Sequence, residues 1–202
     1  MKPFFLLFLF IVPALTFGQT STMNTFYLIP ASVSMAETVN NSMGLGIGYE
    51  RALDKNGKWA VELPVTIGLP GTQQHFDYGV TPLFNSCYSF MPGAKFYTGH
   101  KASKVRYSVG TSFLYETGRQ QQYYESTPGM TTNSVRYQAF GSLINNAINV
   151  YPVKNFSVSL DFAFGMGGQH YSGSRIYLDP FKNTSYEIGG VFQFILKAGY
   201  RF

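Results

Sequence analysis

The stretch EIGGVFQFILKAGYRF, residues 187–202, alternates strictly between two kinds of side chain. Its even positions from 190 onward are Gly190, Phe192, Phe194, Leu196, Ala198, Tyr200 and Phe202. Its odd positions are Val191, Gln193, Ile195, Lys197, Gly199 and Arg201. A period of two predicts a β-strand with one apolar, aromatic face and one face that carries two cations and an amide. This combination is typical of a strand that has lipid on one side and a polar lumen on the other.

The same alternation, of varying regularity, occurs in seven earlier segments. The predicted strands are 24–33, 42–53, 58–69, 85–97, 104–116, 135–151 and 155–166. The pattern is poor in 24–33, which contains Pro30, and its parity slips near Gln138–Phe140 in 135–151. Pro92-Gly93 predicts a bulge in the fourth strand, and Asn56-Gly57 predicts a hairpin turn. The sequence therefore predicts eight strands.

The connections between these strands alternate in length. The longer ones are 34–41, 70–84, 117–134 and 167–186, and the shorter ones are 54–57, 98–103 and 152–154. Short turns on one side of a membrane and longer loops on the other are typical of bacterial outer-membrane barrels. We expect an all-β fold, an eight-stranded antiparallel up-and-down transmembrane β-barrel.

The beginning of the chain predicts export. Met1-Lys2 is followed by an apolar run to Leu15 and by small residues up to Gly18. This order of a positive charge, a short apolar core and small residues predicts a cleaved signal peptide over 1–18. The barrel domain is then expected to span 19–202, and an uncleaved N-terminal anchor is the alternative.

The composition agrees with a membrane barrel. Aromatic residues make up 17% of the 202 residues and charged residues only 12%, about half of the usual charged share. Beyond the N-terminus no run approaches the roughly 18 apolar residues of a spanning helix. The net charge of +5, or +4 once Lys2 is removed, is too diffuse to predict nucleic-acid binding. Cys87 is the sole cysteine and is expected to be a small strand residue.

Charged residues collect on the face of the strands that carries small side chains. They are Glu50, Glu62, Lys95, Arg106, Glu116, Asp161, Lys197 and Arg201. Their mixed signs predict a lumen that is cross-linked by ion pairs, because a channel would be expected to present one sign. Eight strands enclose just enough space for side chains to fill. We therefore expect a packed polar lumen without an open pore, and a selective channel is the alternative.

With these features the chain resembles the small eight-stranded outer-membrane β-barrel proteins of Gram-negative bacteria, the OmpA/OmpX-like class. Gln19 after the expected cleavage site and the final Tyr-Arg-Phe also resemble outer-membrane β-barrel domain proteins of the Bacteroidota. The resemblance implies that Tyr200 and Phe202 form a C-terminal signal for the barrel-assembly machinery. It further implies a monomer in the outer membrane, in contact with lipid and lipopolysaccharide.

Few residues suggest chemistry. His75, His100 and His170 lie in no HExxH, CxxC or P-loop arrangement, so no metal or cofactor is expected. His170 and Ser172 are two apart on one strand face, as a base and a nucleophile would be. Together with Glu187 they resemble the catalytic residues of lipid A 3-O-deacylases, although Gly173 replaces the Asn of that family and the parity of Glu187 points it inward.

We conclude from the sequence that this is an outer-membrane barrel with a structural or surface-interaction role and no enzymatic activity. The first alternative is a lipid A-modifying hydrolase that uses His170, Ser172 and Glu187. The second alternative is a secreted calycin-like barrel that binds a ligand in its lumen.

Overall fold

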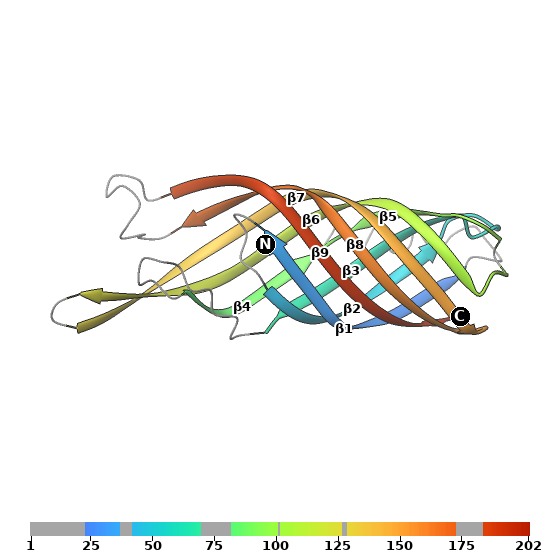
Figure 1. Cartoon of the computed structure of the whole chain (residues 1–202), viewed down its shortest axis with the longest axis horizontal. Coiled ribbons are helices and arrows are strands. Elements are labelled where there is room, and N and C mark those ends of the chain that lie inside the picture. Colours follow the sequence, from blue (N-terminus) through green and yellow to red (C-terminus); the bar gives the residue numbers. More distant parts are fainter. Residues whose placement is uncertain (1–22, 37–41, 70–81, 101, 127–128, 173–183) are drawn as a thin grey trace, which may run out of the picture.

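The computed structural model describes residues 23–36, 42–69, 82–100, 102–126, 129–172 and 184–202. These residues form strands and their connections (Figure 1). The strands are β1 (Asn24–Ala36), β2 (Ser42–Ala52), β3 (Trp59–Gly68), β4 (Pro82–Phe90), β5 (Gly93–Tyr97), β6 (Val105–Ser126), β7 (Gly129–Val153), β8 (Phe156–Ser172) and β9 (Thr184–Arg201). The predicted signal peptide, 1–18, lies outside the described residues.

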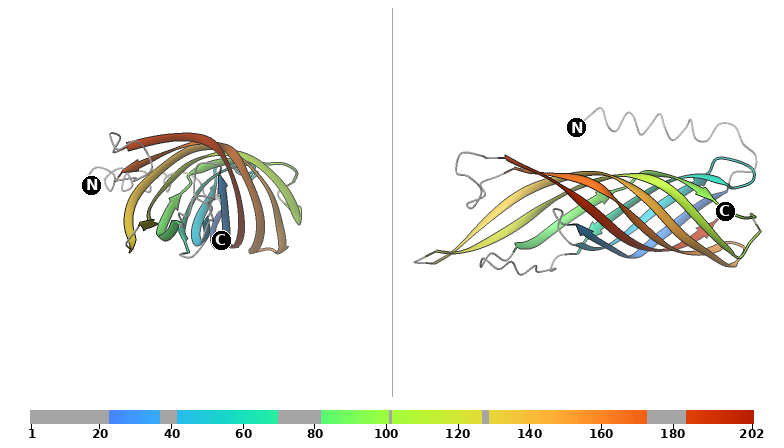
Figure 2. Two further views of the ribbon diagram at one scale, coloured as in Figure 1. Left: turned by 60° about the vertical axis from the view of Figure 1, so that its left-hand side comes forward. Right: turned by 45° about the horizontal axis from the view of Figure 1, so that its top comes forward.

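The strands close into one antiparallel barrel. Each strand pairs with its neighbours around the wall, β9 pairs with β1, and β3 pairs with β2, so none of the described strands is left as a free edge. β4 and β5 each pair with both β3 and β6, so together they occupy one strand position in the wall of the barrel. The two views of Figure 2 show the curved, tilted wall that results. The prediction of an eight-stranded up-and-down barrel is confirmed.

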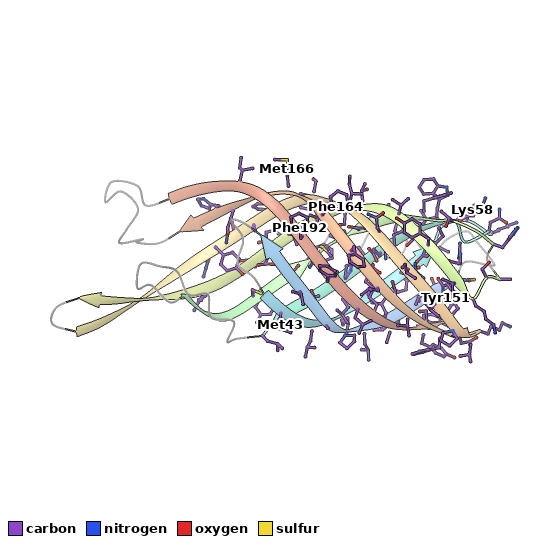
Figure 3. The ribbon with its side chains drawn as sticks, in the orientation of Figure 1. Met43, Lys58, Tyr151, Phe164, Met166 and Phe192 are labelled. Carbon is purple, nitrogen blue, oxygen red and sulfur yellow. The ribbon has the colours of Figure 1, made fainter. Side chains whose placement is uncertain are left out.

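The two faces of the wall differ as the alternation predicted. Large apolar side chains point outward on every strand around the barrel, and Figure 3 shows Met43, Phe164, Met166 and Phe192 projecting away from the wall. Small, polar and charged side chains are buried inside. Phe162 and Phe194 lie opposite each other on β8 and β9 with ring centroids 4.5 Å apart, within one outward aromatic band. Among the described residues no helix is long and apolar enough to cross a membrane.

One end of the barrel carries the 53–58, 98–104 and 154–155 connections, and the other carries 37–41, 69–81, 127–128 and 173–183. Of these, 69–81 and 173–183 are the longest, whereas 37–41 and 127–128 are no longer than the turns at the first end, so the predicted alternation in length is kept only in part. The end with the 53–58, 98–104 and 154–155 turns also holds Phe202, which exchanges two backbone hydrogen bonds with Asn24 (3.0 and 2.9 Å). We call it the turn end, and the opposite end the loop end. Figure 1 shows the β6–β7 hairpin extending furthest at the loop end.

Pro30 explains the weak pattern of the first strand. The register of β1 shifts between Ile29 and Ser32 against β2, and between Leu28 and Ala31 against β9. A bulge leaves one residue of the strand unpaired, so the N–H that Pro30 lacks is not missed by the ladder. It also changes the inward parity from odd (Ile29) to even (Ser32), and this change obscures the alternation in the sequence.

The fourth predicted strand is interrupted rather than bulged. Pro64 on β3 and Pro92 between β4 and β5 both lack an N–H, and they fall at the same point of the ladder. Their carbonyls still accept hydrogen bonds, from the N–H of Met91 (3.1 Å) and of Phe113 (2.9 Å) respectively. The side-chain parity is kept across the break, so Met91 and Lys95 both point into the lumen.

Two predictions about the β6–β7 region were wrong. The predicted 117–134 loop is largely strand, because the β6–β7 ladder runs without a shift from Val105↔Val150 to Ser126↔Gly129. The predicted parity slip near Gln138–Phe140 is also absent. Outward polar residues such as Ser142 and inward apolar ones such as Leu143 imitate a slip in the sequence. The predicted 167–186 loop is likewise shortened at both ends by β8 and β9.

The β2–β3 turn is organised by Asp54. Its carboxylate accepts hydrogen bonds from the N–H groups of Asn56 (3.2 Å), Lys58 (2.8 Å) and Trp59 (2.8 Å). The predicted hairpin turn is present between β2 and β3, and of its Asn-Gly pair only Gly57 has a positive φ, 61°. Slight burial raises the pKa of Asp54, but the three backbone donors outweigh it, and the pKa is lowered from its ordinary value.

Candidate functional site

The centre of the lumen holds four charged side chains from four strands. Glu62 (β3), Lys95 (β5), Asp161 (β8) and Lys197 (β9) are each at most 4% exposed. Lys95 Nζ lies 2.8 Å from Glu62 Oε2 and 2.7 Å from Asp161 Oδ2. Lys197 Nζ lies 2.7 Å and 2.6 Å from the same two oxygens. We call these four residues the charge ring; its two acids and two bases alternate and leave no formal net charge.

The ring is supported by hydroxyl groups on its flanks. Ser159 donates to the other carboxylate oxygen of Asp161, and the Tyr27 hydroxyl lies 3.5 Å from Glu62 Oε2. The Lys197 ammonium also lies 4.9 Å from the centre of the Tyr27 ring. Any side chain at Gly48 would collide with that ring, so glycine is required there to seat Tyr27 in the lumen. Desolvation of four charges is offset only when each has close partners of opposite sign, as here.

A second polar layer lies between the ring and the turn end. Tyr97 donates its hydroxyl to Glu50 (2.7 Å to Oε2), and the Arg106 guanidinium stacks 4.5 Å from the Tyr97 ring centre. Arg106 also donates to the carbonyl of Gly57 (2.6 Å). Arg201 stacks 4.1 Å from the ring centre of Tyr151. Between this layer and the charge ring lies a cavity of about 20 Å³, enough for about one water molecule.

An apolar layer lies between the ring and the loop end. It consists of Ile29, Met91, Leu114, Ala139, Leu143, Ala163, Val191 and Ile195, with Tyr27 at its edge. Beyond it, Tyr137 donates its hydroxyl to Glu116 (2.9 Å). The lumen is therefore not polar along its whole length, because inward positions on several strands carry aliphatic residues that pack against one another.

The structure brings together only some of the predicted lumen charges. Glu62, Lys95, Asp161 and Lys197 meet in the ring, whereas Glu50, Arg106 and Arg201 lie nearer the turn end and contact tyrosines. Tyr27, Tyr97, Tyr137 and Tyr151 were missed as partners. The signal was present, because each occupies an inward position of its strand, from which a tyrosine reaches into the lumen.

The comparisons with known proteins concern the fold. No family model matches the chain, and no curated protein matches it. A major outer membrane protein from Thermus thermophilus matches with a TM-score of 0.58 at 12% identity, over 89% of this chain and 99% of that chain. Outer membrane protein W of E. coli matches with a TM-score of 0.51 at 15% identity, over 91% and 100%. The chain has the fold of an outer-membrane β-barrel.

Other barrels share this architecture more distantly. Ail, the attachment invasion locus protein of Yersinia pestis, has a TM-score of 0.45 at 16% identity, over 90% of this chain and 97% of that chain. At such identities the likeness concerns the fold and not the activity.

The pairing of β8 with β9 separates Glu187 from His170 and Ser172, the other two residues that resemble a deacylase site. β8 continues to Ser172, with His170 opposite Tyr186 and Ser172 opposite Thr184. Glu187 pairs instead with Gln169, whose side chain is buried in the lumen. Positions 170 and 187 therefore belong to opposite faces of the barrel wall, and no bulge interrupts the β8–β9 register between them and the closing end.

The remaining candidate residues lie apart from one another. Tyr200 and Phe202 are exposed at the turn end. Cys87 is buried in the lumen, and His100 is exposed in the β5–β6 turn. His75 and Asp77 lie outside the described residues. Within the described ranges no group of three or more His, Cys, Asp or Glu side chains could hold a metal.

Proposed function

We propose that this chain is an exported outer-membrane protein whose turn end faces the periplasm and whose lumen is closed. Outward apolar side chains on all sides of the wall support residence in lipid. The two longest connections, 69–81 and 173–183, both lie at the loop end and support the orientation, since bacterial barrels keep short turns in the periplasm. The resemblance to Bacteroidota barrels remains an expectation from the sequence.

The observation that supports a closed lumen best is the charge ring with the apolar layer above it. Four ion pairs of 2.6–2.8 Å join opposite walls of the barrel. An ion that passes along the axis would have to separate these pairs and then pass the buried aliphatic side chains that pack together in the apolar layer. We infer that the barrel has a structural role and does not conduct ions.

A role in contact with partners outside the cell is supported by the β6–β7 hairpin. β4 covers β6 only as far as Gln122, and β8 covers β7 only from Arg136 onward. The two strands continue beyond these points as a ribbon paired only with itself up to Ser126↔Gly129, which Figure 1 shows projecting from the loop end. Such a ribbon offers a backbone edge to which an external partner can pair.

The two alternatives have less support. A lipid A deacylase would need His170, Ser172 and Glu187 on one face, and the register assigns Glu187 to the other. A soluble calycin-like barrel would need its largest apolar side chains inside, and here most of them are outside.

Planar-bilayer recording tests the closed lumen. The folded protein, identified by its altered gel mobility before boiling, should give no discrete current steps under conditions in which a known porin does. Reproducible steps from the folded fraction that disappear after heat denaturation would overturn the proposal.

A lipid A mass spectrum tests the hydrolase alternative. Overproduction of the wild-type chain should leave the spectrum unchanged. A loss of acyl chains that Ser172→Ala abolishes would establish the hydrolase instead.

A further inference from the structure

A pocket of about 760 Å³ opens at the turn end of the barrel. It is formed by the β5–β6 turn, the β7–β8 turn and the ends of the described chain. Its lining comprises Met23, Ala102, Ser103, Lys104, Tyr151, Pro152, Val153, Lys154, Asn155, Arg201 and Phe202. We call it the rim pocket. The carbonyl of Lys104 accepts from the N–H of Tyr151 (2.7 Å), and that of Asn155 accepts from the N–H of Arg201 (2.7 Å), so the barrel ladder holds the walls together.

The rim pocket is positively charged. Lys104, Lys154 and Arg201 line it, and the lining residues that the structure describes include no aspartate or glutamate. Glu50, between the charge ring and the turn end, accepts from Tyr97 and is not among the described lining residues. Three cations at one pocket repel one another and favour the binding of an anion.

Arg201 gives a second, independent indication of an anionic ligand. Its guanidinium is held over the Tyr151 ring, and its buried Nε–H has no hydrogen-bond partner among the described residues. A buried donor without an acceptor is unfavourable. Arginine presents its N–H groups in a planar fork that matches phosphate oxygens. The geometry therefore favours an oxyanion, such as a phosphate, over chloride.

The surroundings of the pocket indicate where such a phosphate would come from. Val153 and Phe202 in its lining are 63% and 64% exposed, and Tyr200 and Phe156 stand beside them on the outer wall. Exposed aromatic residues at the end of a barrel mark the membrane–water interface. Phospholipid headgroups are the phosphate groups found at that depth.

We propose that the rim pocket binds the phosphate of an anionic phospholipid in the periplasmic leaflet. Lys104, Lys154 and Arg201 contact the phosphate, and Val153 and Phe202 contact the beginning of an acyl chain. The assignment of the periplasmic leaflet rests on the orientation given under the proposed function. The bound lipid would hold the β5–β6 turn, the β7–β8 turn and the end of β9 together.

The test compares two double variants of equal charge. The full barrel is refolded in a non-ionic detergent, and short-chain phosphatidylglycerol binding is measured by native mass spectrometry. Lys104→Gln/Lys154→Gln removes two cations from the pocket. Lys55→Gln/Lys58→Gln removes two from the β2–β3 turn, and Figure 3 shows Lys58 well separated from Tyr151 at the same end of the barrel. We expect the first variant to bind roughly tenfold more weakly and the second to bind like the wild type.

Three further arms distinguish the sources of the phosphate and the role of Arg201. Phosphatidylcholine should bind more weakly than phosphatidylglycerol, and inorganic phosphate should not compete at equal concentration, because it lacks the acyl contact. Arg201→Lys keeps the charge but removes the fork, and should weaken binding in the same direction as the lysine variant. Equal losses for both lysine pairs, or no loss for either, would contradict the proposal.

The outcomes separate this inference from the proposed function. Protein that never shows the folded, heat-modifiable form would contradict the membrane barrel itself. Folded protein for which inorganic phosphate competes fully would show a phosphate site without a lipid. Folded protein that binds phosphatidylglycerol and phosphatidylcholine equally well would contradict the lipid site in the rim pocket and leave the proposed function intact.

Discussion

The charge ring can be tested by removing one of its lysines. Lys197→Met keeps the length of the side chain but deletes the ammonium that lies 2.7 Å from Glu62 and 2.6 Å from Asp161. Two carboxylates then share Lys95 alone, in a layer where every member is at most 4% exposed. Breaking a buried ion pair in this way costs about 3–5 kcal/mol. We expect the free energy of unfolding to fall by that amount.

A double variant isolates the electrostatic part of this loss. Lys197→Met/Asp161→Asn removes one charge of each sign and leaves the Lys95–Glu62 pair of 2.8 Å in place. Because the remaining ring is neutral, we expect the double variant to be more stable than Lys197→Met alone. The coupling energy between the two positions should be about 1–3 kcal/mol.

The assay uses the sole tryptophan of the chain, Trp59. It is 54% exposed on the outer face and packs against Phe96 in a tilted arrangement with ring centroids 4.9 Å apart, so its fluorescence reports transfer from lipid to water. Urea unfolding in phospholipid vesicles gives the free energy for each variant. Lys58→Met, at an exposed turn lysine, is the matched control and should change stability little. The reasoning is refuted if Lys197→Met loses no more than Lys58→Met, or if the losses of Lys197→Met and Asp161→Asn simply add.

Three further predictions concern other parts of the barrel. Phe194→Arg, on the outward face of β9, should cost roughly 2–4 kcal/mol in the same vesicles and Tyr200→Arg, at the interface, only about 0–1 kcal/mol; equal costs would show that the membrane depth is wrong. Asp54→Asn should destabilise the barrel at pH 7, because the aspartate with a lowered pKa contributes stability above its unfolded pKa of about 3.9. That difference should shrink as the pH falls through the lowered folded pKa, and unfolding curves at pH 7 and pH 3 that differ equally would contradict the turn geometry. Deleting Phe202 removes two backbone hydrogen bonds to Asn24 and the expected assembly residue; it should lower the heat-modifiable fraction without changing the amount of exported precursor, and an unchanged fraction would count against both roles.

The fold was predictable because lipid and lumen impose opposite demands on alternate residues. On β2 and β3 the outward side chains are apolar and the inward ones are mostly small or charged, and on β9 the outward ones are apolar and aromatic, as the sequence pattern indicated. The same reasoning failed where a proline breaks the ladder. The β1 bulge after Ile29 and the interruption at Pro92 both depend on which N–H groups a neighbouring strand needs, and a single segment does not show this.

The contents of the lumen were only partly predictable. Parity placed Glu62 and Asp161 inside, but it could not reveal that both meet Lys95 as well as Lys197, because contacts across the lumen depend on the stagger of eight strands. Leu143 and Ile195 were inward by parity, yet their packing into an apolar layer becomes visible only when the strands are aligned. Polar outward residues such as Ser142 had the opposite effect and hid the true register of β7.

Quenching of tryptophan fluorescence by lipids with brominated acyl chains tests most directly which face of the barrel meets lipid. In a Trp59→Phe background, tryptophan is placed at Phe96, which points outward, or at its neighbour Tyr97, which is buried in the lumen beside the cavity of about 20 Å³. The two positions are adjacent on β5 and therefore lie at nearly the same depth. Strong quenching at position 96 and little at position 97, in folded protein, is the predicted result. Equal quenching at both positions, or stronger quenching at 97, would contradict a lipid-facing barrel with a closed lumen.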